Sequence, residues 1–332
     1  MPGVAVIGTG HWGKNHARVY KELLSEGVID SLKICDSDEG RARHWGETLE
    51  VEYVTGYRDV IEDDGIQAVS IVTPSKTHYQ LGKEFMEAGK DVLVEKPMTM
   101  DIDEAKKLVE VASGNKRILM AGHIFRYHPA VCELKRRIDA DELGEIQNII
   151  GNRLDYGLPR RDMGVIYALG SHELDMFCYL VGVDYPESLL AAESRSYGQN
   201  TEETAVIVMD FGRARGFAFE SWLVSAYGRK RDIVVVGTSR SARVDYLRPQ
   251  ELHIFDSRIV TEEGMPVRVE DDGNRIISLT YAEPLKEELR HFISCVVSRQ
   301  SPLTDGPVGL RAVVMAEAAL RSARTGKTIM LP

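Results

Sequence analysis

Short apolar runs alternate with longer amphipathic stretches through the first third of the chain. Five runs have the length and residue types of buried strands, at residues 4–7, 32–35, 68–72, 92–94 and 118–121. The stretches between them repeat their apolar positions with the period of a helix. Strands that alternate with helices predict a parallel, doubly wound α/β sheet.

The pattern changes near residue 145. Successive β-rich runs then follow one another without helical stretches between them, at residues 146–153, 204–211, 215–223, 233–237, 242–247 and 251–255. Such runs predict an antiparallel or mixed sheet. We therefore expect a doubly wound first domain at 1–121 and an α+β second domain at 122–332, built on a large, mostly antiparallel open sheet.

Two helical patterns follow, at 283–298 and 307–324. Gly326 is a stop signal for the second helix, and a short closing strand is expected at 328–331. We expect the last helix to pack back on the first domain. Because no flexible linker separates the domains, a cleft between them is the expected ligand site.

Composition and charge narrow the class of protein. The 332 residues are 43% hydrophobic and 28% charged, which is typical of a soluble globular protein, and the length favours two domains over one. The net charge of −10 disfavours nucleic-acid binding. No apolar run approaches the roughly 20 residues that span a bilayer, and no signal peptide precedes the first strand. We expect a cytoplasmic protein without membrane or nucleic-acid partners.

Four cysteines, Cys35, Cys132, Cys178 and Cys295, lie far apart in the sequence. No C-x-x-C pair is present, so neither a zinc knuckle nor a dithiol redox motif is expected. All four are predicted to be buried thiols in a reducing compartment.

The first strand leads directly into Gly8-Thr9-Gly10-His11-Trp12-Gly13, and a helical pattern follows from Lys14. In this context the three glycines allow a tight turn, close approach of the backbone to a pyrophosphate, and close packing of helix on strand. The alternative is an ordinary glycine-rich turn. We expect the loop to bind a dinucleotide through Gly8, Gly10, His11, Trp12 and Gly13.

Asp36 ends the second strand. A carboxylate at this position can accept hydrogen bonds from the adenosine ribose and would repel a 2′-phosphate. The sequence therefore predicts NAD in preference to NADP, although Arg41 weakens this preference. The alternative is a plain turn residue, since Asp36-Ser37-Asp38 also suits a turn.

Two further segments follow predicted strands, Thr73-Pro74-Ser75-Lys76-Thr77-His78 and Glu95-Lys96-Pro97. With the glycine loop, they resemble the family of glucose–fructose oxidoreductase, inositol 2-dehydrogenase and their sugar-oxidising relatives, and the resemblance covers essentially the whole chain. It implies that Lys96 lies beside the nicotinamide and the substrate hydroxyl. It also implies that Glu95 is a nicotinamide-side partner and that the proline of the signature often follows a cis peptide bond. The other cofactor-lining residues implied are Thr73, Pro74, His78 and Pro97.

Physical chemistry supports Lys96 independently of the family. At the carboxyl end of a parallel strand, beside a positively charged nicotinamide, an ammonium group loses hydration and is repelled, and both effects lower its pKa. The lysine can then accept a proton. The alternative is that Glu95 and Lys96 form an ordinary surface pair.

In the second domain, residues 164–175 resemble the Gly/His/Asp segment of the same family. The resemblance implies that His172, near the start of a helix, faces the substrate, and Asp175 lies on the same helical face. Many members carry an aspartate four residues before the histidine, where this sequence has Ala168. This difference puts a standard Asp–His dyad in doubt. The alternative for His172 is a structural role at the helix start.

The segment 120–129 joins the predicted domains, and the resemblance places it under the nicotinamide and the substrate. Arg126 is the expected functional residue there, as a cofactor contact, and the alternative is an interdomain salt bridge. His123 and His128 have too few carboxylates near them in the sequence for a metal site, so packing or capping is expected. No metal is predicted.

Arg160 and Arg161 follow the first strand of the second domain. They could hold the diphosphate of a nucleotide-linked sugar through charge-assisted hydrogen bonds. They could equally belong to a solvated loop. The resemblance is closest to branches that act on nucleotide-linked N-acetyl sugars.

Together these features predict an NAD(P)-dependent oxidoreductase that oxidises one ring CH–OH of a sugar. Hydride passes to nicotinamide C4, while Lys96, assisted by His172, receives the hydroxyl proton. The favoured substrate is a nucleotide-linked sugar such as UDP-N-acetylglucosamine, oxidised at C3. The alternatives are a dehydrogenase of a free polyol such as inositol and a dinucleotide-sensing regulatory protein without turnover. A homo-oligomer, either dimer or tetramer, built on the second-domain sheet is also expected.

Overall fold

The computed structural model describes residues 1–197 and 200–332. Its contacts divide the chain into two compact units. The first unit comprises Met1–Ile124 and Glu283–Val313, and the second comprises Phe125–Ala282 and Val314–Pro332. This division differs from a single cut at residue 121, because the chain returns to the first unit after it has completed most of the second sheet.

The first unit contains a six-stranded sheet in the order β3-β2-β1-β4-β5-β6, and every neighbouring pair is parallel. The predicted doubly wound sheet is therefore confirmed. The strand order reverses between β1 and β4, which marks the ligand-binding edge of such a sheet. The strands are β1 Gly3–Ile7, β2 Ser31–Cys35, β3 Glu52–Val54, β4 Ala68–Ile71, β5 Asp91–Glu95 and β6 Leu119–Gly122.

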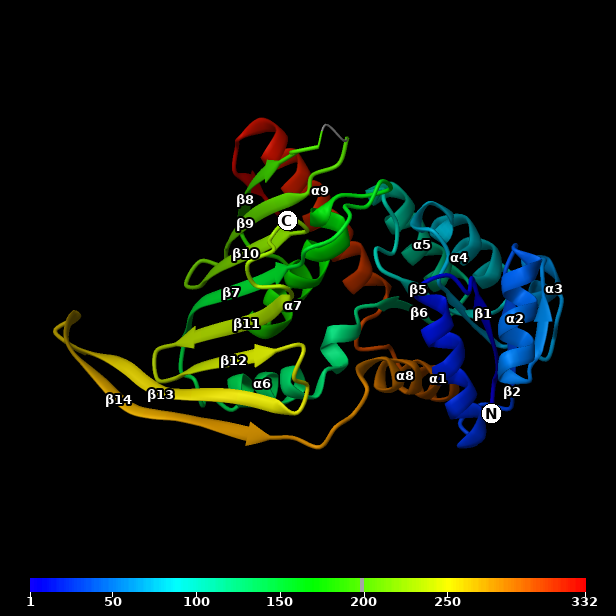
Figure 1. The fold of residues 1–332 in the computed structure, drawn as a ribbon, viewed down its shortest axis with the longest axis horizontal. Helices are drawn as coiled ribbons and strands as arrows, with labels where there is room; N and C mark the ends of the chain where they lie inside the picture. The colour runs from blue at the N-terminus through cyan, green and yellow to red at the C-terminus, as the bar shows by residue number, and fades with distance from the viewer. Residues whose placement is uncertain (198–199) are drawn as a thin grey trace. The chain divides into compact units, whose positions relative to one another are not determined.

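Helices cover this sheet and bury its apolar strands (Figure 1). Helix α8 packs against α1, so a segment from the far end of the sequence completes the first unit. The helices are α1 Gly13–Ser25, α2 Glu39–Leu49, α3 Tyr57–Ile61, the short η1 Ser75–Thr77, α4 His78–Glu87, α5 Ile102–Gly114 and α8 Pro284–Ser298. Helix α9, Gly306–Thr325, begins in the first unit and ends in the second.

The second unit contains a nine-stranded sheet in the order β14-β13-β12-β11-β7-β10-β9-β8-β15. Its neighbours are antiparallel except for the pair β7 and β10, which confirms the predicted mostly antiparallel sheet. The strands are β7 Ile146–Leu154, β8 Ser188–Ser194, β9 Thr204–Asp210, β10 Arg215–Ser221, β11 Lys230–Gly237, β12 Ser241–Asp245, β13 Glu251–Glu262, β14 Met265–Ser278 and β15 Ile329–Met330.

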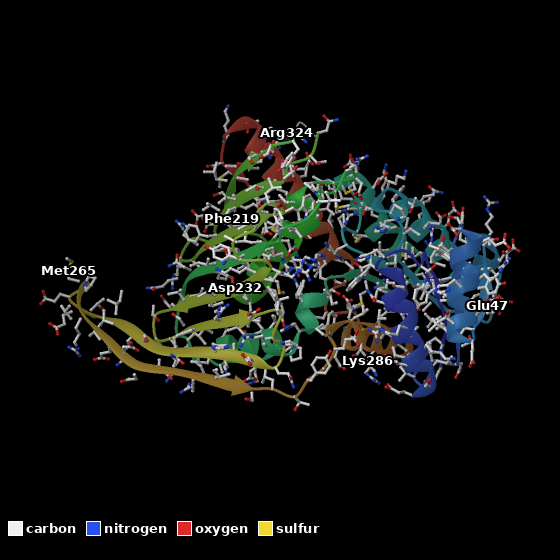
Figure 2. All side chains as sticks on the ribbon, viewed as in Figure 1. Glu47, Phe219, Asp232, Met265, Lys286 and Arg324 are labelled. Atoms are coloured by element: carbon white, nitrogen blue, oxygen red, sulfur yellow. The ribbon has the colours of Figure 1, made fainter. Side chains whose placement is uncertain are left out.

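The sequence pattern missed β8, β14 and the outer half of β13. Strand β14 is almost entirely exposed and rich in charged residues, so no apolar alternation identifies it. It pairs with β13 as a long hairpin, and Met265 lies at the tip of that hairpin (Figures 1 and 2).

One face of the second sheet packs against helices and the other is open. The helices of this unit are η2 Ile124–Tyr127, α6 Pro129–Asp139, the π-helix η3 Ile166–Gly170 and α7 Ser171–Val181. Helix α6 packs on β12 and β13, while α7 packs on β7. Residues at alternate positions, such as Ile149 in β7 and Ile207 in β9, point toward the helices and are fully buried.

The open face carries a band of exposed apolar side chains across four neighbouring strands. The strand register places Leu190, Phe217 and Ile150 in one cross-strand row and Val206 and Phe219 in the next. Each of these five side chains is 37–42% exposed, and Phe219 is labelled in Figure 2. We call this surface the open-face apolar band.

Three of the four cysteines are buried, but Cys132 is exposed, so the expectation of four buried thiols is wrong at that position. Cys132 lies on α6, on the side of the helix away from Val131 and Leu134, which are buried. Among the described residues, no helix is long and apolar enough to cross a membrane.

Candidate active site

The glycine loop between β1 and α1 has the shape of a phosphate cradle. Gly8 has φ +91°, a conformation that favours glycine, and a Cβ on Gly13 would lie 1.9 Å from the Gly8 carbonyl oxygen. A Cβ on Gly10 would meet open space, so the backbone there faces outward. Helix α1 begins at Gly13, and its N-terminus favours a negative charge at this loop. These features fit the pyrophosphate of a dinucleotide.

A cavity of about 690 Å³ lies at the same edge of the sheet. Its lining comes from the ends of β1, β2 and β4 and the segments that follow them, which is where an adenosine would lie in a doubly wound fold. Five of the predicted cofactor-binding residues line this cavity, namely Gly8, Gly10, Asp36, Thr73 and Pro74.

The Asp36 carboxylate is buried at the rim of this cavity and accepts several hydrogen bonds. Its donors are the backbone N–H and hydroxyl of Thr9, at 2.8 and 2.9 Å, and the backbone N–H of Asp38, at 2.9 Å. Arg41 adds two bonds, from Nε at 3.2 Å and Nη2 at 2.9 Å. Burial acts to raise the pKa of Asp36, but Arg41 and Thr9 outweigh it and hold that pKa below its ordinary value.

Glu95 and Lys96 stand at the carboxyl end of β5, on the nicotinamide side of the strand-order reversal. The peptide bond between Lys96 and Pro97 is cis, as the resemblance implied. Glu95 Oε1 accepts hydrogen bonds from Trp12 Nε1 at 2.8 Å and from His16 Nε2 at 3.0 Å. Its Oε2 accepts the backbone N–H of Lys96 at 3.0 Å. Glu95 therefore connects the glycine loop to the lysine.

Gly122 on β6 lies beside Glu95 in the sheet register, and a Cβ there would come within 3.0 Å of the carboxyl group. The missing side chain leaves room for that group. Burial acts to raise the pKa of Glu95, but the hydrogen bond and charge of His16, with help from Trp12 and Lys96, keep it below the ordinary value. Glu95 is thus a buried carboxylate in a defined orientation.

His78 holds two loops together. Its Nδ1 lies 3.0 Å from the Pro97 carbonyl oxygen and its Nε2 lies 2.8 Å from that of Thr73. The ring is almost fully buried and does not line the cavity. His11, by contrast, is exposed at the glycine loop.

In the second unit, the π-helix η3 runs directly into α7 and places His172 in the first turn of α7. π-helical turns are frequent at functional sites. The backbone N–H of Ile166 donates to the carboxylate of Glu202 at 3.0 Å. That carboxylate occupies the space beside Gly164, where a Cβ would be within about 2.1 Å of it. Glu202 thereby holds the start of the segment that carries Ala168 and His172.

Arg126 and Asp175 form an ion pair with each other. Arg126 Nε donates to Asp175 Oδ2 at 3.0 Å, and both side chains are buried. The Arg126 guanidinium also lies 4.7 Å from the ring centre of Tyr179. Both partners of this ion pair belong to the second unit.

A buried charged cluster that was not predicted, made of Arg153, Glu173 and Glu220, lies beside α7. Arg153 Nε lies 2.7 and 2.6 Å from the two carboxyl oxygens of Glu173, and Glu220 is the cross-strand neighbour of Arg153. Burial, with the adjacent Glu173, raises the pKa of Glu220 well above its ordinary value. A charged residue at an inward position of an alternating strand is the signal that identifies Arg153 and Glu220.

Aromatic rings connect this cluster to His172. The Arg153 guanidinium lies 4.2 Å from the ring centre of Phe125, and that ring forms a T-shaped pair with His172 at a centroid distance of 4.8 Å. Tyr246 packs against Phe125 from another side, at 4.5 Å. His172 therefore contacts an aromatic ring that also lies against the Arg153 guanidinium.

Arg160 and Arg161 are exposed in the loop after β7, and Arg160 forms an ion pair with Asp162 at 2.6 Å. His123 and His128 are buried, and His128 precedes α6 and packs its ring against Tyr246. Among the described residues, no group of histidine, cysteine and acidic side chains could hold a metal ion.

The parallel sheet, the glycine cradle and the strand-end lysine define an NAD-binding oxidoreductase. Residues 3–123 match the model of the oxidoreductase family with an NAD-binding Rossmann fold, and residues 135–331 match the model of the C-terminal alpha/beta domain of the same family. The chain belongs to the Gfo/Idh/MocA family of NAD-dependent oxidoreductases, which confirms the resemblance seen in the sequence.

Two curated relatives extend over nearly the whole chain. The scyllo-inositol 2-dehydrogenase (NAD⁺) of Bacillus subtilis is 30% identical, over 98% of this chain and 95% of its own length. The UDP-N-acetylglucosamine 3-dehydrogenase of Acidithiobacillus ferrooxidans is 28% identical, over 94% of each chain. A solved structure of the latter enzyme superposes with a TM-score of 0.82 at 25% identity over 97% of each chain.

A levoglucosan dehydrogenase in complex with NADH and levoglucosan has a TM-score of 0.86 at 19% identity, covering 100% of this chain and 99% of its own. At that identity the similarity shows the shared fold. These relatives are named as inositol and sugar dehydrogenases, and the family matched by the first domain is NAD-binding.

Proposed function

We propose that this protein oxidises one secondary ring hydroxyl of a sugar to a ketone, with Lys96 as the base that takes the hydroxyl proton. The observation that carries the proposal is the end of β5, where Glu95 is held as a carboxylate and Lys96 follows on the nicotinamide side of the sheet. NAD supplies the hydride acceptor. His172, at the start of α7, is assigned to the same substrate as a hydrogen-bonding partner.

The favoured substrate is a nucleotide-linked N-acetyl sugar oxidised at C3. Two observations support it, the relative that is a UDP-N-acetylglucosamine 3-dehydrogenase and the exposed Arg160 and Arg161, which could hold a diphosphate. Two others favour a free polyol such as inositol, namely the scyllo-inositol 2-dehydrogenase relative and the ion pair that already occupies Arg160. Both substrate classes belong in the first experiment.

The test is turnover and thermal stabilisation of the NAD-loaded protein with nucleotide sugars, free sugars and inositols. A ligand that binds the native state raises the melting temperature. Reduction of NAD by one class identifies the substrate. Binding of NAD without turnover of any candidate would favour a regulatory protein and contradict the proposal.

The arginine pair has its own test. Replacing Arg160 and Arg161 together by alanine should raise KM for a nucleotide sugar by more than about tenfold, or roughly 1.4 kcal/mol, while NADH binding stays unchanged. Arg213→Ala, which removes an arginine exposed elsewhere in the second unit, is the matched control. An unchanged KM would contradict a role for this loop in substrate binding.

A further inference from the structure

Helix α1 carries a histidine in its buried stripe. His16 is inaccessible to solvent and lies among the buried residues Ala17, Val19 and Tyr20 of the same helix. A polar ring at such a position reduces stability unless it is hydrogen-bonded. A side chain without accessible surface also cannot touch a substrate or a cofactor. Any effect of His16 on the reaction must therefore act through its neighbours.

The hydrogen-bonded neighbour of His16 is Glu95. His16 Nε2 lies 3.0 Å from Glu95 Oε1, and Trp12 Nε1 donates to the same oxygen at 2.8 Å. Residues 12 and 16 are one helical turn apart, so both side chains lie on the face of α1 that meets the end of β5. The second ring nitrogen of His16, Nδ1, has no hydrogen-bond partner within residues 1–197 and 200–332. The ring is therefore oriented by its bond to Glu95.

Glu95 links this contact to Lys96. Its other oxygen, Oε2, accepts the backbone N–H of Lys96 at 3.0 Å, so one carboxyl group is bonded to α1 and to the backbone of the proposed base. Gly122 of β6 leaves the space that the carboxyl group occupies. His78 bonds to the carbonyl oxygen of Pro97, the next residue along, at 3.0 Å. The backbone at Lys96 is thus held on both sides.

The contact with His16 also determines the charge of Glu95. Burial acts to raise the pKa of Glu95, because a buried carboxyl group favours its neutral form. The hydrogen bond and charge of His16 are the largest effects that lower this pKa, ahead of Trp12 and Lys96. A protonated Glu95 would carry a hydrogen on one oxygen, and that hydrogen would compete with an N–H donor. Loss of the His16 bond would therefore loosen the other two.

We propose that His16 is a positioning residue for the oxidation, and that it holds the Glu95 carboxylate against the backbone of Lys96 so that the lysine amine meets the substrate hydroxyl. The inference rests on the proposed role of Lys96 as the base. Proton transfer requires donor and acceptor atoms within hydrogen-bond reach, so a small displacement of Lys96 lowers activity. A residue that touches no ligand thereby contributes to turnover.

The first test compares two replacements of His16. Leucine fills a similar volume without an N–H group, whereas glutamine keeps an amide N–H that can reach Glu95. His16→Leu should lower kcat by about tenfold or more and leave the Kd for NADH nearly unchanged, because a displaced base slows proton transfer. His16→Gln should restore most of the lost turnover.

Tyr20→Phe is the matched control. Tyr20 is fully buried one turn further along the same face of α1, and its hydroxyl is bonded to Ser70 at 2.8 Å. This variant also loses one buried hydrogen bond, so it should unfold at lower urea than the wild type but keep the wild-type kcat.

Three results would overturn the proposal. They are a wild-type kcat in His16→Leu, an equal loss of kcat in the leucine and glutamine variants, and an equal loss in Tyr20→Phe. If His16→Leu does not fold, two predictions still decide. His16→Gln must keep most of the wild-type kcat, and Trp12→Phe, which removes the other N–H from the same carboxyl oxygen, must lower it.

A second measurement needs no substrate. It compares the urea unfolding of four apoproteins, namely the wild type, His16→Leu, Glu95→Gln and the double variant, and gives the coupling free energy between the two residues. The folded-state pKa of Glu95 is lowered, so the coupling should be fully present above the ordinary glutamate pKa and be lost as pH falls through the folded-state value. Burial, then the charge of Glu95, raises the pKa of Glu288 on α8, and that acid is common to all four proteins.

The coupling separates the two proposals. A coupling that is absent at neutral pH, or that does not change with pH, would show that His16 does not hold Glu95 as a carboxylate and would contradict the inference. If the coupling has the expected pH dependence but no sugar is oxidised, the proposed function fails while the hold of His16 on Glu95 stands.

Discussion

At the scale of single residues, the two predicted proton-transfer residues are held in different ways. Lys96 follows a carboxylate that three N–H groups fix in place. His172 instead contacts the ring of Phe125, with the guanidinium of Arg153 behind it. Ala168 offers no carboxylate to stabilise an imidazolium on His172. The lysine is therefore expected to take most of the proton-transfer role.

Lys96→Ala should lower kcat by more than about a hundredfold, which is the lower range for loss of a general base. His172→Ala should cost less and act partly through KM, because we propose that this residue contributes mainly to substrate binding. Steady-state kinetics of both variants, with NADH affinity measured by fluorescence, check the prediction. If both variants lose kcat equally while their NADH affinity is unchanged, His172 is an equal partner of Lys96 in proton transfer, and the prediction is wrong.

Cofactor choice also depends on single residues. The wild type should bind NADH more tightly than NADPH, because the ionised Asp36 repels a 2′-phosphate. Asp36→Asn keeps the shape but removes that charge, so NADPH should bind about tenfold more tightly, a gain of roughly 1.4 kcal/mol, helped by the nearby Arg41. Asp38→Asn retains the cap of α2 and serves as the control. Wild-type protein that binds NADPH as tightly as NADH would contradict the role of Asp36.

At the scale of elements, the position of α7 depends on charges buried between it and the sheet. Arg153 of β7 and Glu173 of α7 are both inaccessible to solvent, and Glu220 of β10 lies beside them. A buried ion pair contributes little net stability, but removal of one partner leaves a buried charge without compensation. The helix that carries His172 is thus sensitive to any change in this cluster.

Arg153→Met should destabilise the protein by about 3–5 kcal/mol, because Glu173 loses its cation in a buried site. Arg153→Met with Glu173→Leu removes both charges and should recover most of that loss. Urea unfolding followed by fluorescence measures both variants. If the double variant is no more stable than the single one, the pair contributes through packing and not through its charges.

At the scale of the whole molecule, the open-face apolar band suggests an assembly. Solvated sheet faces usually carry polar side chains, and an apolar surface that spans several strands is typical of an interface. The strands of this face come from segments of the second unit only, so the surface does not depend on the first unit. A second copy of the chain is the occupant that we propose.

Light scattering at micromolar concentration should therefore report a homo-oligomer. Phe217→Lys with Phe219→Lys places two charges in the open-face apolar band and should shift the protein toward the monomer, because burial of unpaired charge opposes association. Val297→Lys, at an exposed apolar position of the first unit, is the control. A wild-type monomer would contradict the proposal.

Much of the fold was predictable because it depends on local pattern. Short apolar runs between helical patterns identified five of the six strands of the parallel sheet, and successive β-rich runs identified the greater part of the second sheet. The glycine loop and the segment Glu95-Lys96-Pro97 were recognised because each is a short run whose chemistry depends on its neighbours in sequence. Strands β8 and β14 were not predicted. Pairing with β13 stabilises β14, although most of β14 has no apolar alternation of its own.

The sequence by itself determined the class of fold, and it predicted the cofactor cradle and the role of Lys96. Only the tertiary structure decided which side chains support them. The contacts of Glu95 come from residues about 80 positions earlier. The physical reason is that burial and charge compensation depend on which elements pack together, and no local pattern records whether a polar residue in an apolar stripe will find a partner.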